Sequence, residues 1–496
     1  MTKVYSLQER IVKGGVTTIV LTIFGSIFAY LIRILYSRTL SIEDYGLFYA
    51  VFGFVTLVMA YVDLGFGYSI VYLLPKYLKL KDYSKAWNIF IYGQIISLGM
   101  SAIISFFLIL GAPFLAKYYF RVPGSENVIY MFCFYGITYS IISGLVQIYS
   151  GFQKEKYYSL ITVFRWSFTF VFSIMFFFFD SSNVLFYSIA WSIGHILTAV
   201  IFIWLLYYKH AYLTDNKIYW SKDLFKQMYV LALPSLLTTL IGSLVVFTDS
   251  LFLTLFRGLK EVGIYNVVYP VASISVVLLN PINIFVLPLV SHLMVDKKEK
   301  IKLLVNKIME VVPFIGVYFA LFIILFPSSV ATLLFGQKWL GLIEVPMSLL
   351  AVAFVILPLA SLLEVVLLGV GMVKERLKMV ILINFANLAL NGLLIWQYGI
   401  FGVVFTKIIV TMLSVVLFIH ILKPVVFIKV PILFYSKILF VSLIIFISCK
   451  ILGLYPRNIL EYISMGLVYS IFFIIAGYYL KVFDYNLLKQ LFNRTS

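Results

Sequence analysis

Long apolar stretches recur along the whole chain, each bounded by charged residues or by a break that carries proline or glycine. An α-helix needs about twenty consecutive apolar residues to cross the hydrocarbon core of a bilayer. The pattern therefore predicts an all-α polytopic membrane protein with about fourteen transmembrane helices. They are expected at residues 12–35, 46–73, 87–112, 128–150, 158–179, 184–208, 229–256, 262–289, 309–333, 344–370, 377–397, 401–421, 433–453 and 459–480.

The composition supports this prediction. Hydrophobic residues make up 63% of the 496 residues, charged residues only 12%, and the mean hydropathy is +1.06. A water-soluble fold cannot bury that much apolar surface. The first apolar stretch is longer than a signal peptide core and lacks a small-residue cleavage site, so we expect it to be a retained span. Cys133 and Cys449 both fall inside predicted spans, which argues against a disulfide framework or a metal site.

The basic residues alternate between loops. With a cytoplasmic N-terminus, the inner segments collect 27 of the 38 lysines and arginines, and the outer segments collect nine. The positive-inside rule predicts this distribution for an even number of spans with both termini cytoplasmic. The net charge of +18 is spread over short loops and forms no single stripe, so we expect no nucleic-acid partner.

Two loop motifs occur twice. Residues 43–48 (EDYGLF) resemble residues 260–265 (KEVGIY) at a shift of 217, and residues 151–156 parallel residues 371–376 at a shift of 220. Because six spans separate equivalent points, both halves enter the membrane in the same direction. We therefore expect two six-helix lobes related by a pseudo-two-fold axis along the membrane normal, a common transporter plan.

The repeat also predicts the domain boundaries. The N-terminal lobe, helices 1–6, is expected at residues 1–215, and the C-terminal lobe, helices 7–12, at residues 216–430. Two extra helices, 13 and 14, and a cytoplasmic tail are expected at residues 431–496. Chance similarity among apolar segments is the alternative, since glycine, serine and threonine are frequent in membrane helices.

Six short motifs follow one another in a fixed order: residues 33–38 (RILYSR), 43–48 (EDYGLF), 63–65 (DLG), 233–234 (LP), 261–265 (EVGIY) and 334–336 (LFG). Together they resemble the polysaccharide transporter family, which includes the flippases for O-antigen and other lipid-linked oligosaccharides. This family belongs to the multidrug, oligosaccharidyl-lipid and polysaccharide exporter superfamily. The resemblance covers nearly the whole chain.

The resemblance implies a flippase of the plasma (inner) membrane that carries a polyprenyl pyrophosphate-linked oligosaccharide by alternating access. We also expect membrane lipids as partners, a proton or sodium ion as the coupling ion, and association with a polysaccharide polymerase or glycosyltransferases. The sequence shows no glycine-rich phosphate loop, so no nucleotide cofactor is expected, nor any other cofactor.

Charged side chains inside predicted spans are candidate site residues, because each costs about 2.5–3.5 kcal/mol at the bilayer centre. Arg165 is the first candidate for a pyrophosphate or acidic sugar, since a guanidinium stays charged and binds oxygens through two hydrogen bonds. Arg33 and Lys407 are further candidates, although Lys407 is also close enough to a span end to snorkel. Asn280 and Asn387 suit either sugar hydroxyls or interhelical hydrogen bonds.

The intramembrane acids have two open interpretations. Asp63, Asp249 and Glu364 either pair with the cations or bind the coupling ion. His195 is either a packed histidine or a proton relay. In the first span, Thr18, Thr22, Gly25 and Arg33 share one face with Ala29, which suits close helix packing as well as a polar cavity. No catalytic residue and no metal ligand set is expected.

Three other functions fit the sequence less well. A multidrug or cation exporter and a flippase for a peptidoglycan lipid precursor would share the expected fold. A membrane polysaccharide polymerase or ligase would need a sizeable outer loop to hold acid, base and arginine residues. The longest expected outer loop, near residues 117–127, offers only Arg121 and Glu126 beyond its lysine.

Overall fold

The computed structural model describes residues 7–296, 298–426, 428–451 and 458–480, together with Gly453, Pro456 and Val482. The predicted C-terminal tail beyond Val482 lies outside them. The described chain is helical and divides into two compact units, Met1–Gly263 and Ile264–Ser496. Thirteen helices are long and apolar enough to span a membrane within this described part. A further long helix, Lys222–Phe256, coincides with the remaining predicted span. The fold is therefore that of a multi-pass membrane protein.

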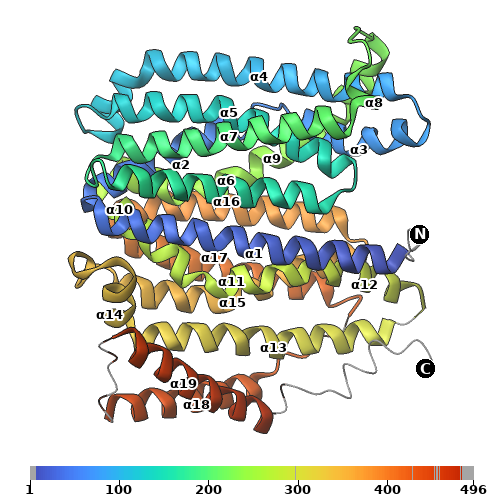
Figure 1. Cartoon of the computed structure of the whole chain (residues 1–496). Coiled ribbons are helices and arrows are strands. Elements are labelled where there is room, and N and C mark those ends of the chain that lie inside the picture. The colour runs from blue at the N-terminus through green and yellow to red at the C-terminus, as the bar shows by residue number, and fades with distance from the viewer. Residues whose placement is uncertain are drawn as a thin grey trace. The chain divides into compact units, whose positions relative to one another are not determined.

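The N-terminal unit is built from nine helices and one π-helical turn, and the start of a tenth helix completes it (Figure 1). They are α1 (Leu7–Thr39), α2 (Ile42–Met59), α3 (Phe66–Lys79), α4 (Tyr83–Phe114), η1 (Leu115–Phe120), α5 (Glu126–Gly151), α6 (Glu155–Phe177), α7 (Val184–Lys209), α8 (Ala211–Thr214), α9 (Lys222–Phe256) and α10 (Leu259–Ala272). The helix α6 packs on both α1 and α7, and α5 packs on α4 and α7.

The C-terminal unit contains the helices that follow α10. They are α11 (Ile274–Leu279), η2 (Asn280–Ile282), α12 (Asn283–Asp296), α13 (Lys298–Leu325), α14 (Pro327–Val330), η3 (Ala331–Phe335), η4 (Gln337–Trp339), α15 (Glu344–Gly369), α16 (Val373–Tyr398), α17 (Ile400–Leu422), α18 (Ile432–Ile451) and α19 (Ile459–Tyr479). The helix α15 packs on α13 and α17, while α18 and α19, red in Figure 1, pack on α13. The contacts of α9 with α2 and α3 fall within the N-terminal unit.

Two predicted spans are not continuous helices. The expected helix 46–73 ends at Met59 and resumes at Phe66, and the expected helix 262–289 is interrupted at Ser273 and again at residues 280–282. In the first break Leu64 has a φ of +47° and Gly65 a φ of +80°, a left-handed conformation that stops an α-helix. The two breaks overlap when the sequence is shifted by 217 residues, which supports the internal repeat.

The repeated loop motif forms a close backbone contact. A Cβ atom at Gly46 would lie 1.9 Å from the carbonyl oxygen of Leu259, and one at Gly263 would lie 2.6 Å from the carbonyl oxygen of Ile42. The shift of 217 residues relates Gly46 to Gly263 and Ile42 to Leu259, so the contact is reciprocal, as a local two-fold relation requires. Both sides of the contact lie in the N-terminal unit. The first turns of α2 and α10 can cross this closely only because each motif supplies a glycine.

Candidate functional site

A cluster of polar side chains lies between the helices of the N-terminal unit. It brings together Arg165 of α6, Trp191 and His195 of α7, and Tyr135 of α5. The helices α6 and α7 approach closely here, because a Cβ atom at Gly194 would lie 2.7 Å from the backbone nitrogen of Thr169. The two helices are neighbours that run in opposite directions. Arg165 lies one turn before Thr169 on α6, and it is therefore close to the part of α7 that carries His195.

Tyr135 connects the members of this cluster. Its ring meets that of His195 edge to face, with centroids 4.7 Å apart. Arg165 lies within electrostatic range of both Tyr135 and His195. The hydroxyl of Tyr135 approaches Thr56 of α2 and the indole of Trp191, but neither of these groups completes a hydrogen bond of good geometry. Four helices of one unit therefore contribute to the cluster.

Several nitrogens in this cluster have no hydrogen-bond partner among the described atoms. They are Arg165 Nε, Trp191 Nε1 and His195 Nε2. His195 is 1% exposed and Trp191 is 3% exposed, so bulk water does not satisfy these two side chains. Each unpaired buried polar group costs about 1–3 kcal/mol. Such a cost is common at sites whose polar groups bind a ligand.

Arg165 has no carboxylate within 4.0 Å in the part of the chain that the structure describes. Its guanidinium carbon lies 4.8 Å from the ring centroid of Trp166, and Trp166 in turn meets Trp191 edge to face at 5.4 Å. The aromatic faces give the cation a favourable but uncharged environment. The positive charge of Arg165 is therefore not neutralised by a nearby acid.

His195 carries its proton on Nδ1. This nitrogen lies 2.8 Å from the carbonyl oxygen of Trp191, and a carbonyl only accepts, so Nδ1 is the donor. Nε2 of the neutral ring is then an acceptor that no described donor reaches. The sequence had already marked Arg165 and His195, but Tyr135 and Trp191 were missed. The spacing of four residues between Trp191 and His195 on one helix was the available signal.

The other predicted site residues of the N-terminal unit have separate environments. Arg33 lies over the ring of Tyr49, 4.6 Å from its centroid, and donates a hydrogen bond to the Tyr45 hydroxyl. Asp63 caps the break between α2 and α3: its carboxylate accepts from the Gly65 backbone at 2.9 Å and from Gln147 Nε2 at 3.1 Å. Asp249 of α9 is 1% exposed.

The small-residue stripe of the first span packs against a neighbouring helix at two of its positions. A Cβ atom at Gly25 would lie 3.5 Å from Val163 of α6, an ordinary contact distance. Thr18 of the same stripe reaches the hydroxyl of Tyr158 at 3.5 Å. At these positions, close helix packing describes the stripe better than a polar cavity does.

In the C-terminal unit, Glu364 pairs with Arg376, whose Nε donates to the carboxylate at 2.9 Å. Arg376 was not among the cations that the sequence analysis expected to pair with Glu364. Asn387 is 2% exposed and accepts a hydrogen bond from Asn391 at 3.2 Å on the same helix. Lys407 is half-buried on α17, and Asn280 is exposed at the interruption between α11 and α12.

Comparison with known proteins identifies the family. Residues 11–294 match the family model described as "Polysaccharide biosynthesis protein", which is more than half of the chain. The chain belongs to this family. An uncharacterized membrane protein of Methanocaldococcus jannaschii is 24% identical over 417 residues, which are 81% of this chain and 82% of the relative.

Two solved structures share the fold. The lipid II flippase MurJ, in an inward closed conformation, superposes with a TM-score of 0.69 at 14% identity, over 96% of this chain and 99% of MurJ. An inward-facing multidrug resistance MATE family transporter superposes with a TM-score of 0.68 at 15% identity, over 83% of this chain and 98% of that chain. The chain is therefore a member of the polysaccharide biosynthesis protein family, and MurJ and MATE establish the fold alone.

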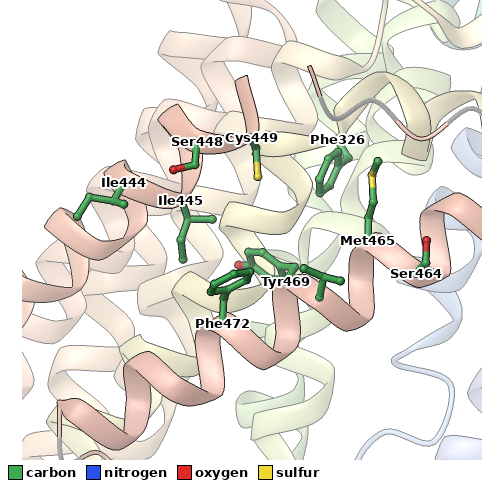
Figure 2. A pocket seen from close by; sticks show the side chains of 10 residues that line it. Phe326, Ile444, Ile445, Ser448, Cys449, Ser464, Met465, Tyr469 and Phe472 are labelled. Atoms are coloured by element: carbon green, nitrogen blue, oxygen red, sulfur yellow. The ribbon is translucent and has the colours of Figure 1, made fainter. Parts of the chain in front are cut away.

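An apolar groove lies between the last two helices of this family member. Figure 2 shows side chains of α18 and α19 facing a common space, with Phe326 at its edge. The groove has a volume of about 470 Å³, and its lining is almost entirely hydrocarbon and aromatic. A second apolar hollow of about 460 Å³ lies among α13, α15, α17 and α18. These surfaces suit hydrocarbon chains better than sugars.

A basic and aromatic cluster ties the end of α7 to the end of α5. Nε2 of His210 lies 3.2 Å from Nζ of Lys154, and the imidazole stacks on Phe152 at 4.4 Å. Burial, assisted by the charges of Lys154 and Lys209, lowers the pKa of His210 to about 4. Nε2 of the neutral ring therefore accepts a hydrogen bond from Lys154, and Nδ1 donates one to the hydroxyl of Tyr212, 3.0 Å away.

This arrangement predicts a loss of stability in acid. An unfolded histidine has a pKa of about 6.5, so the unfolded chain binds the proton first as the pH falls, and stability declines between about pH 6.5 and pH 4. The loss should be on the order of 3 kcal/mol, because each pKa unit corresponds to about 1.4 kcal/mol. Thermal unfolding of the wild type and of His210→Gln should show a difference that shrinks as the pH falls through this window. A difference that stays constant would contradict the assignment.

Proposed function

We propose that the protein is a flippase that moves a polyprenyl pyrophosphate-linked oligosaccharide, or polysaccharide repeat unit, across the plasma membrane by alternating access. The observation that carries the proposal is Arg165, a cation in a membrane span with no neutralising acid in the described structure. Such a charge is expensive to bury and is kept where it binds something. A pyrophosphate or acidic sugar supplies the missing negative oxygens, which a guanidinium binds in pairs.

The surroundings of Arg165 suit a sugar-phosphate headgroup. Trp166 presents its aromatic face beside the guanidinium, and indole faces stack on the apolar sides of sugar rings. The groove between α18 and α19 suits the polyprenyl chain, because its lining is apolar. The cargo we propose has both chemical parts, a charged headgroup and a long hydrocarbon tail.

The orientation belongs to the same proposal. The lysine and arginine distribution favours cytoplasmic termini, and the plasma membrane is where the cargo is assembled on one face and used on the other. We also propose that the chain transports and does not catalyse. A proton or sodium gradient would bias the exchange between the two access states. Neighbouring glycosyltransferases or a polymerase would supply and consume the cargo.

Reconstitution in vesicles tests the proposal. A fluorescent lipid-linked oligosaccharide is placed in both leaflets, and a membrane-impermeant reductant then bleaches the label that faces outward. With the protein present, we expect the inner-leaflet label to become accessible and be bleached, while vesicles without the protein keep it. The same assay is repeated with a labelled peptidoglycan lipid precursor and with a cationic dye, which represent the two alternative functions. Transport of the dye with no movement of either lipid would overturn the proposal in favour of an exporter.

A further inference from the structure

Two hollows of the C-terminal unit adjoin where the chain enters α18. The first has a volume of about 690 Å³ and is lined by α13, by the segment before α18, by the first turns of α18 and by the end of α19. The second is the apolar hollow of about 460 Å³ among α13, α15, α17 and α18. Val430 lines both hollows, and all of their lining residues belong to one compact unit.

The first hollow is basic, whereas the second is apolar. Lys429 and Lys437 line the first, and neither has a carboxylate within 4.0 Å among the residues that the structure describes. Glu310 lines the same hollow, but it is already paired with Lys307 at 3.0 Å. The lining of the second hollow consists of aliphatic residues, methionines, a proline and a tyrosine. A space for negative charge therefore adjoins a space for hydrocarbon.

Hydrogen bonds to α13 hold the basic hollow in place. The backbone N–H of Lys429 donates to Oδ1 of Asn306 at 3.1 Å, and the hydroxyl of Tyr435 donates to the carbonyl oxygen of Met309 at 2.7 Å. These two bonds attach the segment before α18, and the first turn of α18, to the same helix. The backbone of Lys429 is thus fixed beside the hollow, while the residue itself stays exposed.

We propose that the two hollows together bind one anionic phospholipid of the surrounding bilayer. Its phosphate group lies between Lys429 and Lys437, and one of its hydrocarbon chains extends past Val430 into the apolar hollow. The groove of Figure 2 shares no lining residue with either space, so this lipid is distinct from the polyprenyl chain proposed above. The inference does not depend on the identity of the transported cargo.

The position of the hollows favours a lipid of the bilayer. Lys429 and Lys437 belong to a segment that the distribution of basic residues assigns to the cytoplasmic face. The anionic lipids of that leaflet give it a negative surface potential, and basic pockets between transmembrane helices bind their head groups. Val416 and Leu439 line the apolar hollow and are 63% and 66% exposed, so a chain can enter it from the bilayer.

An anionic phospholipid uses both hollows, whereas simpler ligands use one. A soluble phosphate would gain only the attraction of the two lysines, and a lipid without net charge would gain mainly the burial of its hydrocarbon chain. The strength of membrane-lipid binding increases with buried apolar area and with electrostatic attraction. We therefore expect the anionic lipid to bind more tightly than either of the other two ligands.

Native mass spectrometry of the full chain in an uncharged detergent tests the proposal. The protein is titrated with phosphatidylglycerol and with phosphatidylcholine that has the same chains, and glycerol phosphate is the soluble probe. We expect phosphatidylglycerol to bind about 25-fold more tightly than phosphatidylcholine, because each of the two lysines contributes about fivefold. A higher ionic strength should reduce this preference, since salt screens exposed charges.

Variants separate the charged part of the site from the apolar part. Lys429→Gln and Lys437→Gln should each reduce the preference by about fivefold, and the double variant should abolish it. Lys423→Gln removes an exposed lysine of the same segment that does not line the hollow, and it should behave as the wild type. Val416→Trp fills part of the apolar hollow and should weaken the binding of both phospholipids without changing their ratio.

Equal binding of the two phospholipids, or the same loss of preference in Lys423→Gln as in the double variant, would overturn the inference. Glycerol phosphate that binds as tightly as phosphatidylglycerol would assign the basic hollow to a free phosphate and would also overturn it. Displacement of phosphatidylglycerol by an equal amount of polyprenyl pyrophosphate would assign the hollow to the cargo instead. The vesicle assay follows movement of the cargo, so each proposal can fail while the other stands.

Discussion

Replacement of Arg165 by glutamine is expected to lower the rate of lipid-linked oligosaccharide flipping by about 10- to 100-fold. The substitution removes charge-assisted hydrogen bonds worth about 1.5–3 kcal/mol to an anionic headgroup. Arg165→Lys keeps the charge but loses the planar fork, so we expect an intermediate rate. The measurement is the rate of label bleaching in vesicles that contain equal amounts of folded protein.

The stability of these variants separates binding from folding. An arginine inside a span disfavours insertion by about 2.5–3.5 kcal/mol, so Arg165→Gln should fold at least as well as the wild type. Lys222→Gln removes one positive charge from the exposed first turn of α9 and should leave flipping unchanged. Equal flipping by wild type and Arg165→Gln would remove Arg165 from the site. A parallel loss of flipping and of monodisperse protein would instead assign it a structural role.

The helices could be predicted from hydropathy because length and apolar character decide membrane insertion. The breaks at residues 60–65, at residue 273 and at residues 280–282 could not be predicted, since all of them lie within apolar windows that suggest a continuous helix. Asp63 shows why the first break is not visible in the sequence. Its carboxylate replaces the missing helical partner of the Gly65 N–H, so a side chain that suggested ion binding also stabilises a turn.

The membership of the candidate site was only partly predictable. The cost of burying charge identified Arg165 and His195 individually, whereas their association depends on the crossing of α6 and α7 at Gly194. Hydropathy does not encode such a crossing. Glu364 illustrates the same limit. Its partner Arg376 lies twelve residues away, across the turn between two helices, and in the sequence it resembles any other basic loop residue.

Replacement of Gly46 by alanine is expected to prevent most of the protein from folding correctly. A Cβ atom at this position would lie 1.9 Å from the Leu259 carbonyl oxygen, and a backbone atom cannot turn away as a side chain can. Overpacking in well-packed cores costs about 1–3 kcal/mol, and we expect this site to lie at the upper end. The measurement is the yield of monodisperse protein in detergent and its thermal unfolding midpoint. Gly263→Ala should act in the same direction, because it blocks the reciprocal contact with Ile42.

Gly99→Ala is the matched control for this prediction. Gly99 lies within α4, and a Cβ atom there would meet no atom within 4 Å, so the change adds the same methyl group without a clash. Alanine is also the better helix former, by about 1 kcal/mol in exposed helix interiors. We therefore expect Gly99→Ala to match or exceed the wild type in stability. If Gly46→Ala were as stable as Gly99→Ala, the close crossing of the two repeat motifs would not exist in the folded protein. Close packing would then not be the reason why glycine occurs in both motifs.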